Sequence, residues 1–143
     1  MKLVKWNPML TMSPFERFVE DVLGSFESGR RMQNDQWIPR ADITEDAGHY
    51  YVHIELPGVS KDDVNITIAD QVLSITGEKK ITGQDGVNVV FNERVYGTFE
   101  RKFTLSDDID HAHIDAAFKD GVLTITMPKT ERAKRREIKV KGK

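Results

Sequence analysis

The sequence predicts an all-β domain, an antiparallel β-sandwich, between a helical N-terminal arm and a flexible C-terminal extension. Apolar residues recur with a period of two along residues 37–128, whereas the segment before them has a helical period. Short turn signals separate the apolar runs. The charge also divides the 143 residues: residues 1–36 are neutral, residues 37–128 carry eight basic and sixteen acidic side chains (net −8), and residues 129–143 carry a net +6.

The N-terminal arm, residues 1–36, contains a predicted amphipathic helix. Ser13, Pro14 and Glu16 have the order of an N-cap, a first-turn proline and a capping-box glutamate. Spacings of three and four place six apolar residues on one helical face: Phe15, Phe18, Val19, Val22, Leu23 and Phe26. This face either packs on its own domain or contacts other subunits and the exposed apolar surface of other proteins.

The first strands of the domain, which begins at Trp37, are predicted from alternation. One strand places four apolar residues on one face: Tyr50, Val52, Ile54 and Leu56. The residues "LPG" end it, since proline and glycine interrupt a strand. A second strand contains Val64, Ile66 and Ile68. A third contains Leu73 and Ile75 and continues to Gly77.

The second half of the domain contains three more predicted strands and one short candidate strand, Val89 to Arg94, after a polar loop. The first of the three presents Phe99, Arg101, Phe103 and Leu105 on one face. The next presents Ile114, Ala116 and Phe118. After a turn at Asp120 and Gly121, the last presents Leu123, Ile125 and Met127. Pro128 ends it because proline has no N–H donor for a ladder.

Arg101 interrupts this apolar pattern, because it shares the face of Phe99 and Phe103. A buried charge without a partner costs several kcal/mol, about as much as most single core mutations. The guanidinium should therefore meet a carboxylate or backbone carbonyls, or else reach water at a sheet edge.

Catalysis has little support in the sequence. The chain has no cysteine, which excludes disulfides, thiol catalysis and thiolate metal sites. No phosphate-binding loop or nucleophile elbow occurs, and no nucleophile, base and orienting group can be recognised together. His111 and His113 have the same parity, but two candidate ligands without a third favour ordinary loop histidines. We expect no enzyme, no cofactor and no metal.

Membrane and nucleic-acid partners are also disfavoured. No stretch of about 20 apolar residues occurs, as a membrane span would need, and no signal peptide is apparent, which predicts a cytoplasmic protein. The basic extension could contact phosphates, yet it has no aromatic residue for base stacking and adjoins a domain of net −8.

Several segments, in order, resemble the small heat shock proteins of the alpha-crystallin domain family, bacterial and plant type. They are "WIPRADITED", "YVHIELPGVSKDDVNI", "LSITGEKK", "ERVYGTFERKFTL", "AAFKDGVLTITMPK" and "EIKV". The family usually has Asn where this chain has Asp120, a change that keeps the turn because both residues tolerate positive φ. The matching residues extend over nearly the whole chain.

The resemblance implies an immunoglobulin-like sandwich and an ATP-independent holdase, which binds partly unfolded client proteins and prevents their aggregation. It further implies a homo-oligomer built from dimers, and ATP-driven chaperones that receive the clients. We expect the arm to bind clients through Phe15, Phe18, Val22 and Phe26. The alternative function is a monomeric β-sandwich adaptor of the co-chaperone type.

The resemblance also implies a dimer contact. A strand in the long loop after Gly77, "VVFNER", would pair with "WIPRADI" of a neighbouring subunit. The residues expected at this contact are Trp37, Ile38, Val89, Val90, Phe91 and Arg101.

Ile138 and Val140 match the family's I-x-V anchor, which inserts two side chains into a groove. Their spacing of two places both on one face of an extended segment. From Pro128 to Ile138 is ten residues, a reach of roughly 33 to 36 Å, against a radius of gyration of about 12 Å for such a domain. We expect the groove to belong to a neighbouring subunit rather than to the same one. The implied groove residues are Val64, Ile66, Ile68, Ile114, Ala116 and Phe118.

Overall fold

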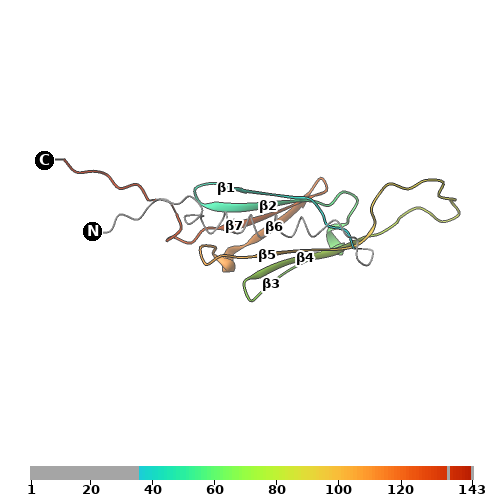
Figure 1. Ribbon diagram of the computed structural model, residues 1–143, viewed down its shortest axis with the longest axis horizontal. Helices are drawn as coiled ribbons and strands as arrows, with labels where there is room; N and C mark the ends of the chain where they lie inside the picture. Colours follow the sequence, from blue (N-terminus) through green and yellow to red (C-terminus); the bar gives the residue numbers. More distant parts are fainter. Residues whose placement is uncertain (1–35, 135, 143) are drawn as a thin grey trace, which may run out of the picture. The chain divides into compact units, whose positions relative to one another are not determined.

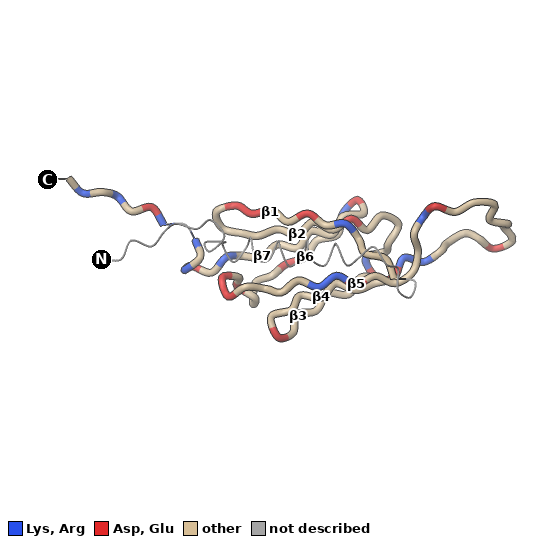
Figure 2. The backbone as a smooth tube through the Cα atoms, viewed as in Figure 1, with Lys and Arg blue, Asp and Glu red and all other residues tan. Residues whose placement is uncertain are grey.

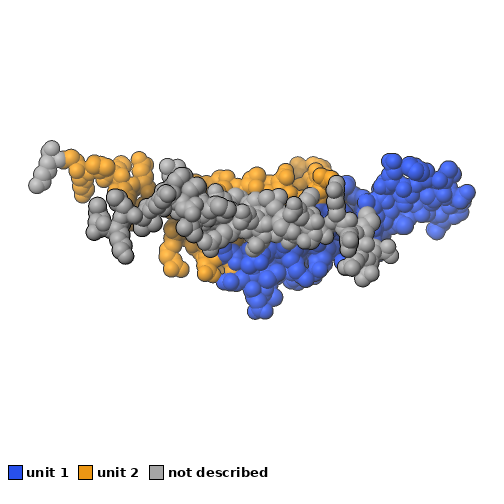
Figure 3. Space-filling model, in the orientation of Figure 1, with its two compact units in different colours: residues 1–39, 57–106 blue, residues 40–56, 107–143 orange. Residues whose placement is uncertain are grey.

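The computed structural model describes residues 36–134 and 136–142 (Figure 1). They form two compact units, which Figure 3 shows in different colours and which are described here one at a time. The first unit comprises the residues up to Pro39 and Pro57–Ser106, and the second comprises Arg40–Leu56 and the residues from Asp107 onward. Within the described ranges, no helix has the length and apolar character needed to cross a membrane.

The second unit is built on a four-stranded antiparallel sheet of order β1-β2-β7-β6. The strands are β1 (Ala41–Glu45), β2 (His49–Glu55), β6 (Asp115–Lys119) and β7 (Val122–Pro128). The central strands pair so that Val52 lies opposite Ile125. One face of this central pair is buried, with side chains that are no more than 6% exposed: Tyr50, Val52, Ile54, Leu123, Ile125 and Met127. The period-two pattern therefore marks the core correctly.

The first unit is built on a three-stranded antiparallel sheet of order β3-β4-β5. The strands are β3 (Val64–Ala69), β4 (Val72–Lys79) and β5 (Gly97–Thr104). Its buried apolar residues include Leu73, Ile75, Phe99, Phe103 and Leu105. In β4, a Cβ on Gly77 would lie 2.5 Å from Cζ of Phe99 and closer still to the carbonyl oxygen of Asp63. Only glycine, which has no Cβ, fits at this position without moving its neighbours.

Two hairpin turns have positive φ at both central residues, the geometry that matches the twist of the strands they join. In the turn between β6 and β7, φ is 53° at Asp120 and 76° at Gly121. This turn was predicted. In the turn between β3 and β4, φ is 49° at Asp70 and 62° at Gln71. The second turn has no glycine, and no turn was predicted from the residues there.

The predicted all-β class is confirmed, and six of the predicted strands are present as β2 to β7. The candidate strand from Val89 to Arg94 is not formed within the single chain, since the described residues between β4 and β5 contain no strand; its pairing with a second copy stays a prediction. A strand needs a neighbour for its backbone hydrogen bonds, and none lies beside this segment. The predicted amphipathic helix lies outside the described residues.

Candidate functional site

Among the described residues of the first unit, the loop between β4 and β5 carries the most exposed apolar side chains. Phe91 is 78% exposed and Val90 is 92% exposed, while Val89 is about half exposed. Figure 1 shows this loop extending beyond the ends of the two strands. Consecutive residues with exposed apolar side chains are unusual on the surface of a monomeric protein. They favour a binding role for this loop.

Trp37 lies next to β5 in the same unit. Its backbone N–H donates to the carbonyl oxygen of Thr98 at 3.1 Å, and its indole Nε1 donates to the carbonyl oxygen of Gly97 at 3.1 Å. Its ring meets Phe99 edge to face, with centroids 5.2 Å apart. The neighbouring residue, Ile38, is 45% exposed. Trp37 thus holds this segment against the sheet while Ile38 stays accessible.

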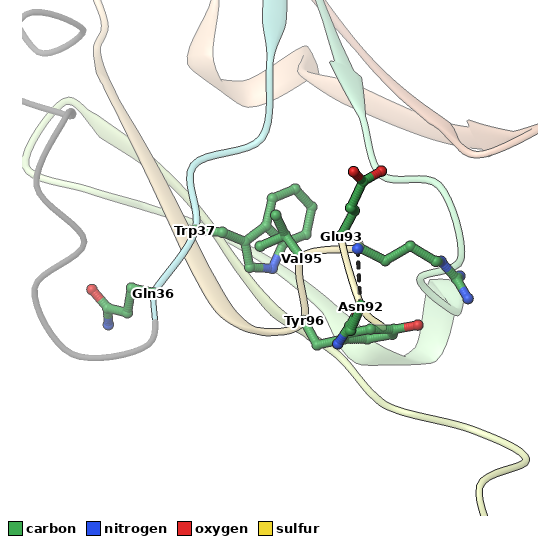
Figure 4. Close-up of a pocket in the computed structure, with 7 residues that line it drawn as sticks. Gln36, Trp37, Asn92, Glu93, Val95 and Tyr96 are labelled. Atoms are coloured by element: carbon green, nitrogen blue, oxygen red, sulfur yellow. Dashed lines mark hydrogen bonds between the residues drawn. The ribbon is translucent and has the colours of Figure 1, made fainter. Parts of the chain in front are cut away.

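A pocket of about 280 Å³ lies beside Trp37, and Figure 4 shows the side chains around it. The loop contributes five of its residues, which follow one another in sequence, and the segment before β1 contributes two. They are Gln36, Trp37, Asn92, Glu93, Arg94, Val95 and Tyr96. Asn92 Oδ1 accepts a hydrogen bond from the backbone N–H of Arg94 at 3.0 Å, which fixes the turn at the pocket wall.

Arg101 is buried, as its position on the apolar face of β5 predicted, and is 7% exposed. Its Nη1 donates to the carbonyl oxygen of Pro39 at 3.2 Å, and its guanidinium lies 5.4 Å from the ring centroid of Phe103. The expectation of a backbone carbonyl as partner is therefore confirmed. Desolvation by burial lowers the pKa of Arg101.

The two residues predicted to be the C-terminal anchor are highly exposed. Ile138 is 82% exposed and Val140 is 95% exposed, in a segment without helix or strand. Figure 2 shows basic positions along this segment, with an acidic position among them. Two β-branched apolar side chains with no cover in the described chain are available to another surface.

Lys129 fixes the point where this segment leaves β7. Its Nζ donates to Glu45 Oε2 at 2.6 Å and to the backbone carbonyl of Asp46 at 2.8 Å. The ammonium also lies 4.5 Å from the ring centroid of Tyr50. Its side chain is only 9% exposed. The backbone N–H of Lys129 donates to the carbonyl oxygen of Gly48 at 2.8 Å, so the backbone of this residue is held in place as well as its side chain.

Tyr50 connects the same region to the loop before β6. Its hydroxyl donates to Asp108 Oδ2 at 2.6 Å. Desolvation and this bond to Asp108 raise the pKa of Tyr50. The backbone N–H of Thr130 donates to the carbonyl oxygen of Asp108 at 2.8 Å. The sequence analysis did not identify Lys129 as a structural residue, because its partners lie more than eighty positions away along the chain.

The predicted groove residues lie on two edge strands. Val64, Ile66 and Ile68 are on β3, an edge of the first unit's sheet, and Ile68 is 40% exposed. Ala116 and Phe118 are on β6, an edge of the second unit's sheet, and Ile114 immediately precedes it. Ala116 is exposed, whereas Ile114 and Phe118 are half-buried. Edge strands present free backbone groups and are suited to peptide addition.

The two histidines considered as metal ligands lie on η2 (His111–His113), a single 3-10 turn. Asp110 caps this turn, and its Oδ2 lies 2.7 Å from Nδ1 of His113. In residues 36–134 and 136–142, no three His, Cys, Asp or Glu residues are grouped so that they could hold a metal ion. The predicted client-binding residues Phe15, Phe18, Val22 and Phe26 lie outside the described part of the chain.

Comparison with known protein families gives a match to the Hsp20/alpha crystallin family over residues 42–141. Among curated relatives, small heat shock protein C4 of Rickettsia felis is 37% identical over 127 residues, which cover 88% of this chain and 77% of the relative. Heat shock protein 16 of Schizosaccharomyces pombe is 33% identical over 144 residues, covering 92% of this chain and all of the relative.

A solved small heat-shock protein from Xylella fastidiosa, described as having a distinct high order structure, has a similar fold. It is 35% identical with a TM-score of 0.63, and the match covers 75% of this chain and 99% of that one.

Proposed function

The chain belongs to the Hsp20/alpha crystallin family, and we propose that it is an ATP-independent chaperone, a holdase that binds partly unfolded proteins and prevents their aggregation. Membership confirms the resemblance and the fold class predicted from the sequence. The proposal includes the predicted organisation: arm 1–36, domain 37–128 and extension 129–143. It also includes a homo-oligomer built from dimers, acting without catalysis, in the cytoplasm, and upstream of ATP-driven chaperones.

The observation that carries the proposal is the accessible apolar surface of an otherwise charged chain. Val90 and Phe91 in one loop, and Ile138 and Val140 in the extension, are all more than three-quarters exposed. Charged residues make up 31% of the sequence, so these side chains are surrounded by strongly hydrated groups. Burying an Ile and a Val stabilises a contact by roughly 3 to 6 kcal/mol before the cost of ordering the segment. Such contacts are reversible, as a holdase and its subunits require.

For the dimer, the exposed loop residues supply one side and the segment of Trp37 and Ile38 supplies the other. The loop has no strand partner in the described chain, and Trp37 already continues the sheet beside β5 through its hydrogen bonds to Thr98 and Gly97. A loop from a second copy could add a strand beyond Trp37. The Xylella relative is described as having a distinct high order structure, which supports assembly from several copies but not this contact in particular.

The chaperone proposal is tested by heating a client enzyme with the purified protein, without ATP, and recording light scattering. We expect scattering by the client to fall as the protein is added, up to about one subunit for each client molecule. A double substitution, Val90→Ser with Phe91→Ser, should weaken both the dimer and the protection. The matched control is Gln84→Ser with Asn88→Ser in the same loop, which removes no apolar surface.

Two outcomes contradict the proposal. If scattering does not fall at any ratio, the protein is not a holdase. If light scattering of the protein alone gives a monomer that is nevertheless active on one folded chaperone, the adaptor function is correct instead.

A further inference from the structure

Lys79 is a buried lysine at the end of a core face. It is the last residue of β4 and continues the buried face of Leu73 and Ile75, yet it carries a charge. It is 9% exposed. Its Nζ lies 5.8 Å from the ring centroid of Trp37 and 5.8 Å from that of Tyr96. The ammonium is therefore held by aromatic faces, a favourable but modest interaction compared with a charged hydrogen bond.

Arg94 approaches the same place from the loop. Its guanidinium lies over the ring of Tyr96, 5.2 Å from the centroid. A Cβ built on Gly58 would lie 3.8 Å from Nζ of Lys79 and 3.6 Å from Nη2 of Arg94. Gly58 also has φ of +76°, so both its backbone and the space beside it favour glycine. Since the two distances add to 7.4 Å, Nζ of Lys79 and Nη2 of Arg94 lie no farther apart than that, both beside Gly58.

The other lysines with contacts in this unit are paired differently. Lys80 Nζ lies 2.5 Å from Asp63, which raises its pKa, and Lys102 Nζ lies 2.8 Å from Glu100. In the part of the chain that the structure describes, no carboxylate forms an ion pair with Lys79 or Arg94. Glu93 lines the neighbouring pocket with Arg94, but it is in none of the ion pairs of the described residues.

Like charges that converge in a partly desolvated place repel each other, and an anion between them removes that cost. The aromatic rings of Trp37 and Tyr96 exclude water from one side and strengthen such a contact. We propose that Gly58, Lys79 and Arg94, between Trp37 and Tyr96, form a binding site for a single oxyanion, a phosphate or a carboxylate. Binding of a free anion does not depend on the proposed chaperone activity, whereas binding of a second copy's carboxylate rests on the proposed dimer.

Two sources can supply this oxyanion: a free anion in solution, or a carboxylate on a second copy of the chain. The acidic balance of residues 37–128 repels anions in general, so binding must depend on these two cations. Removing either charge should therefore weaken binding, whereas removing a nearby paired charge should not.

The test is a titration with inorganic phosphate at constant ionic strength, which separates binding from screening. Trp6→Phe in the full chain leaves Trp37 as the one tryptophan, and its fluorescence reports on the site. We expect a saturable change, and an apparent Kd at least about tenfold higher in Lys79→Met, the effect of one charged hydrogen bond. Arg94→Gln, a change of an exposed side chain, should also raise the Kd.

The matched control is Lys80→Met, which removes the adjacent lysine and should leave the Kd unchanged. Thermal unfolding of each variant checks the fold, and Arg94→Gln provides the test if Lys79→Met unfolds. Light scattering distinguishes the sources: phosphate lowers the mass of the assembly if it displaces a carboxylate of a second copy, and leaves it constant if the ligand is free. The site is refuted if the parent shows no saturable change, or if Lys79→Met and Arg94→Gln respond as the parent does.

Discussion

At the scale of single residues, two buried cations are stabilised in different ways. Arg101 has a backbone carbonyl and an aromatic ring as its neighbours, through Pro39 and Phe103. Lys129 has a carboxylate, a carbonyl and the ring of Tyr50. Since desolvation disfavours the charged form, each arrangement must supply enough contacts to keep the charge inside. Removing the cation leaves those contacts without a donor.

Replacement of Arg101 by Ala should lower the free energy of unfolding by about 2 to 4 kcal/mol, because the carbonyl of Pro39 loses its donor and a cavity forms beside Phe103. Urea unfolding followed by circular dichroism measures the change. Lys102→Ala is the matched control, since Lys102 is exposed and pairs only with Glu100. Its effect should stay within about 0.5 kcal/mol. Equal effects of the two substitutions would contradict the structural role of Arg101.

At the scale of elements, the turn between β1 and β2 is held by one carboxylate. Asp46 Oδ1 accepts from the backbone N–H groups of Gly48 and His49, each at 2.8 Å, and its Oδ2 accepts from the hydroxyl of Tyr51 at 2.8 Å. The backbone bond from Gly48 contributes most, followed by the Tyr51 hydroxyl, and together the contacts lower the pKa of Asp46 from 3.8 to about 2. The folded state therefore favours the charged form.

This depressed pKa predicts the direction of acid sensitivity. Asp46 contributes stability above pH 3.8, and the contribution is lost as the pH falls from about 4 to about 2. In Asp46→Asn the melting temperature should fall less steeply over this interval than in the parent, because the amide does not titrate. Calorimetry at a series of pH values measures both slopes. Parallel slopes would show that Asp46 is not favoured as a carboxylate in the folded state.

The close contact at Gly77 makes β4 sensitive to a single methyl group. Gly77→Ala would place a Cβ against Phe99 and the carbonyl of Asp63, and β4 or its neighbours would have to move. We expect a loss of about 1 to 3 kcal/mol, the usual cost of overpacking. Gly142→Ala is the control, since no atom lies within 4 Å of its added Cβ. Similar melting temperatures for the two variants would contradict the contact.

The sequence predicts an element well when local pattern decides its structure. β2, β5 and β7 follow from alternation because each buries every second residue. The candidate strand at Val89 could not be judged from alternation, because the pattern does not reveal whether a pairing partner is present. Lys79 was missed since a lysine is expected outside, although its parity with the buried residues of β4 was a signal.

At the scale of the whole molecule, the proposed anchor predicts how assembly depends on the extension. Ile138→Gly with Val140→Gly should reduce the oligomer toward dimers, because the groove contact loses both side chains, while the domain stays folded. Light scattering measures the mass, and circular dichroism checks the fold. Lys139→Gly with Lys141→Gly is the matched control, with the same added flexibility and no loss of apolar surface. An unchanged oligomer in the first variant would make the segment a solubility extension.

Lys129 is hydrogen-bonded to Glu45 and Asp46, and Thr130 is hydrogen-bonded to Asp108. These bonds shorten the linker between the domain and the proposed anchor. The last of these bonds to the domain is at Thr130, so no more than eight residues rather than ten lead to Ile138, with a reach of at most roughly 26 to 29 Å. Effective concentration falls as about the −3/2 power of linker length, so the shorter tether raises the local concentration of the anchor about 1.4-fold. Lys129 and Thr130, both remote from the proposed anchor, thereby modestly favour its binding to every groove within range.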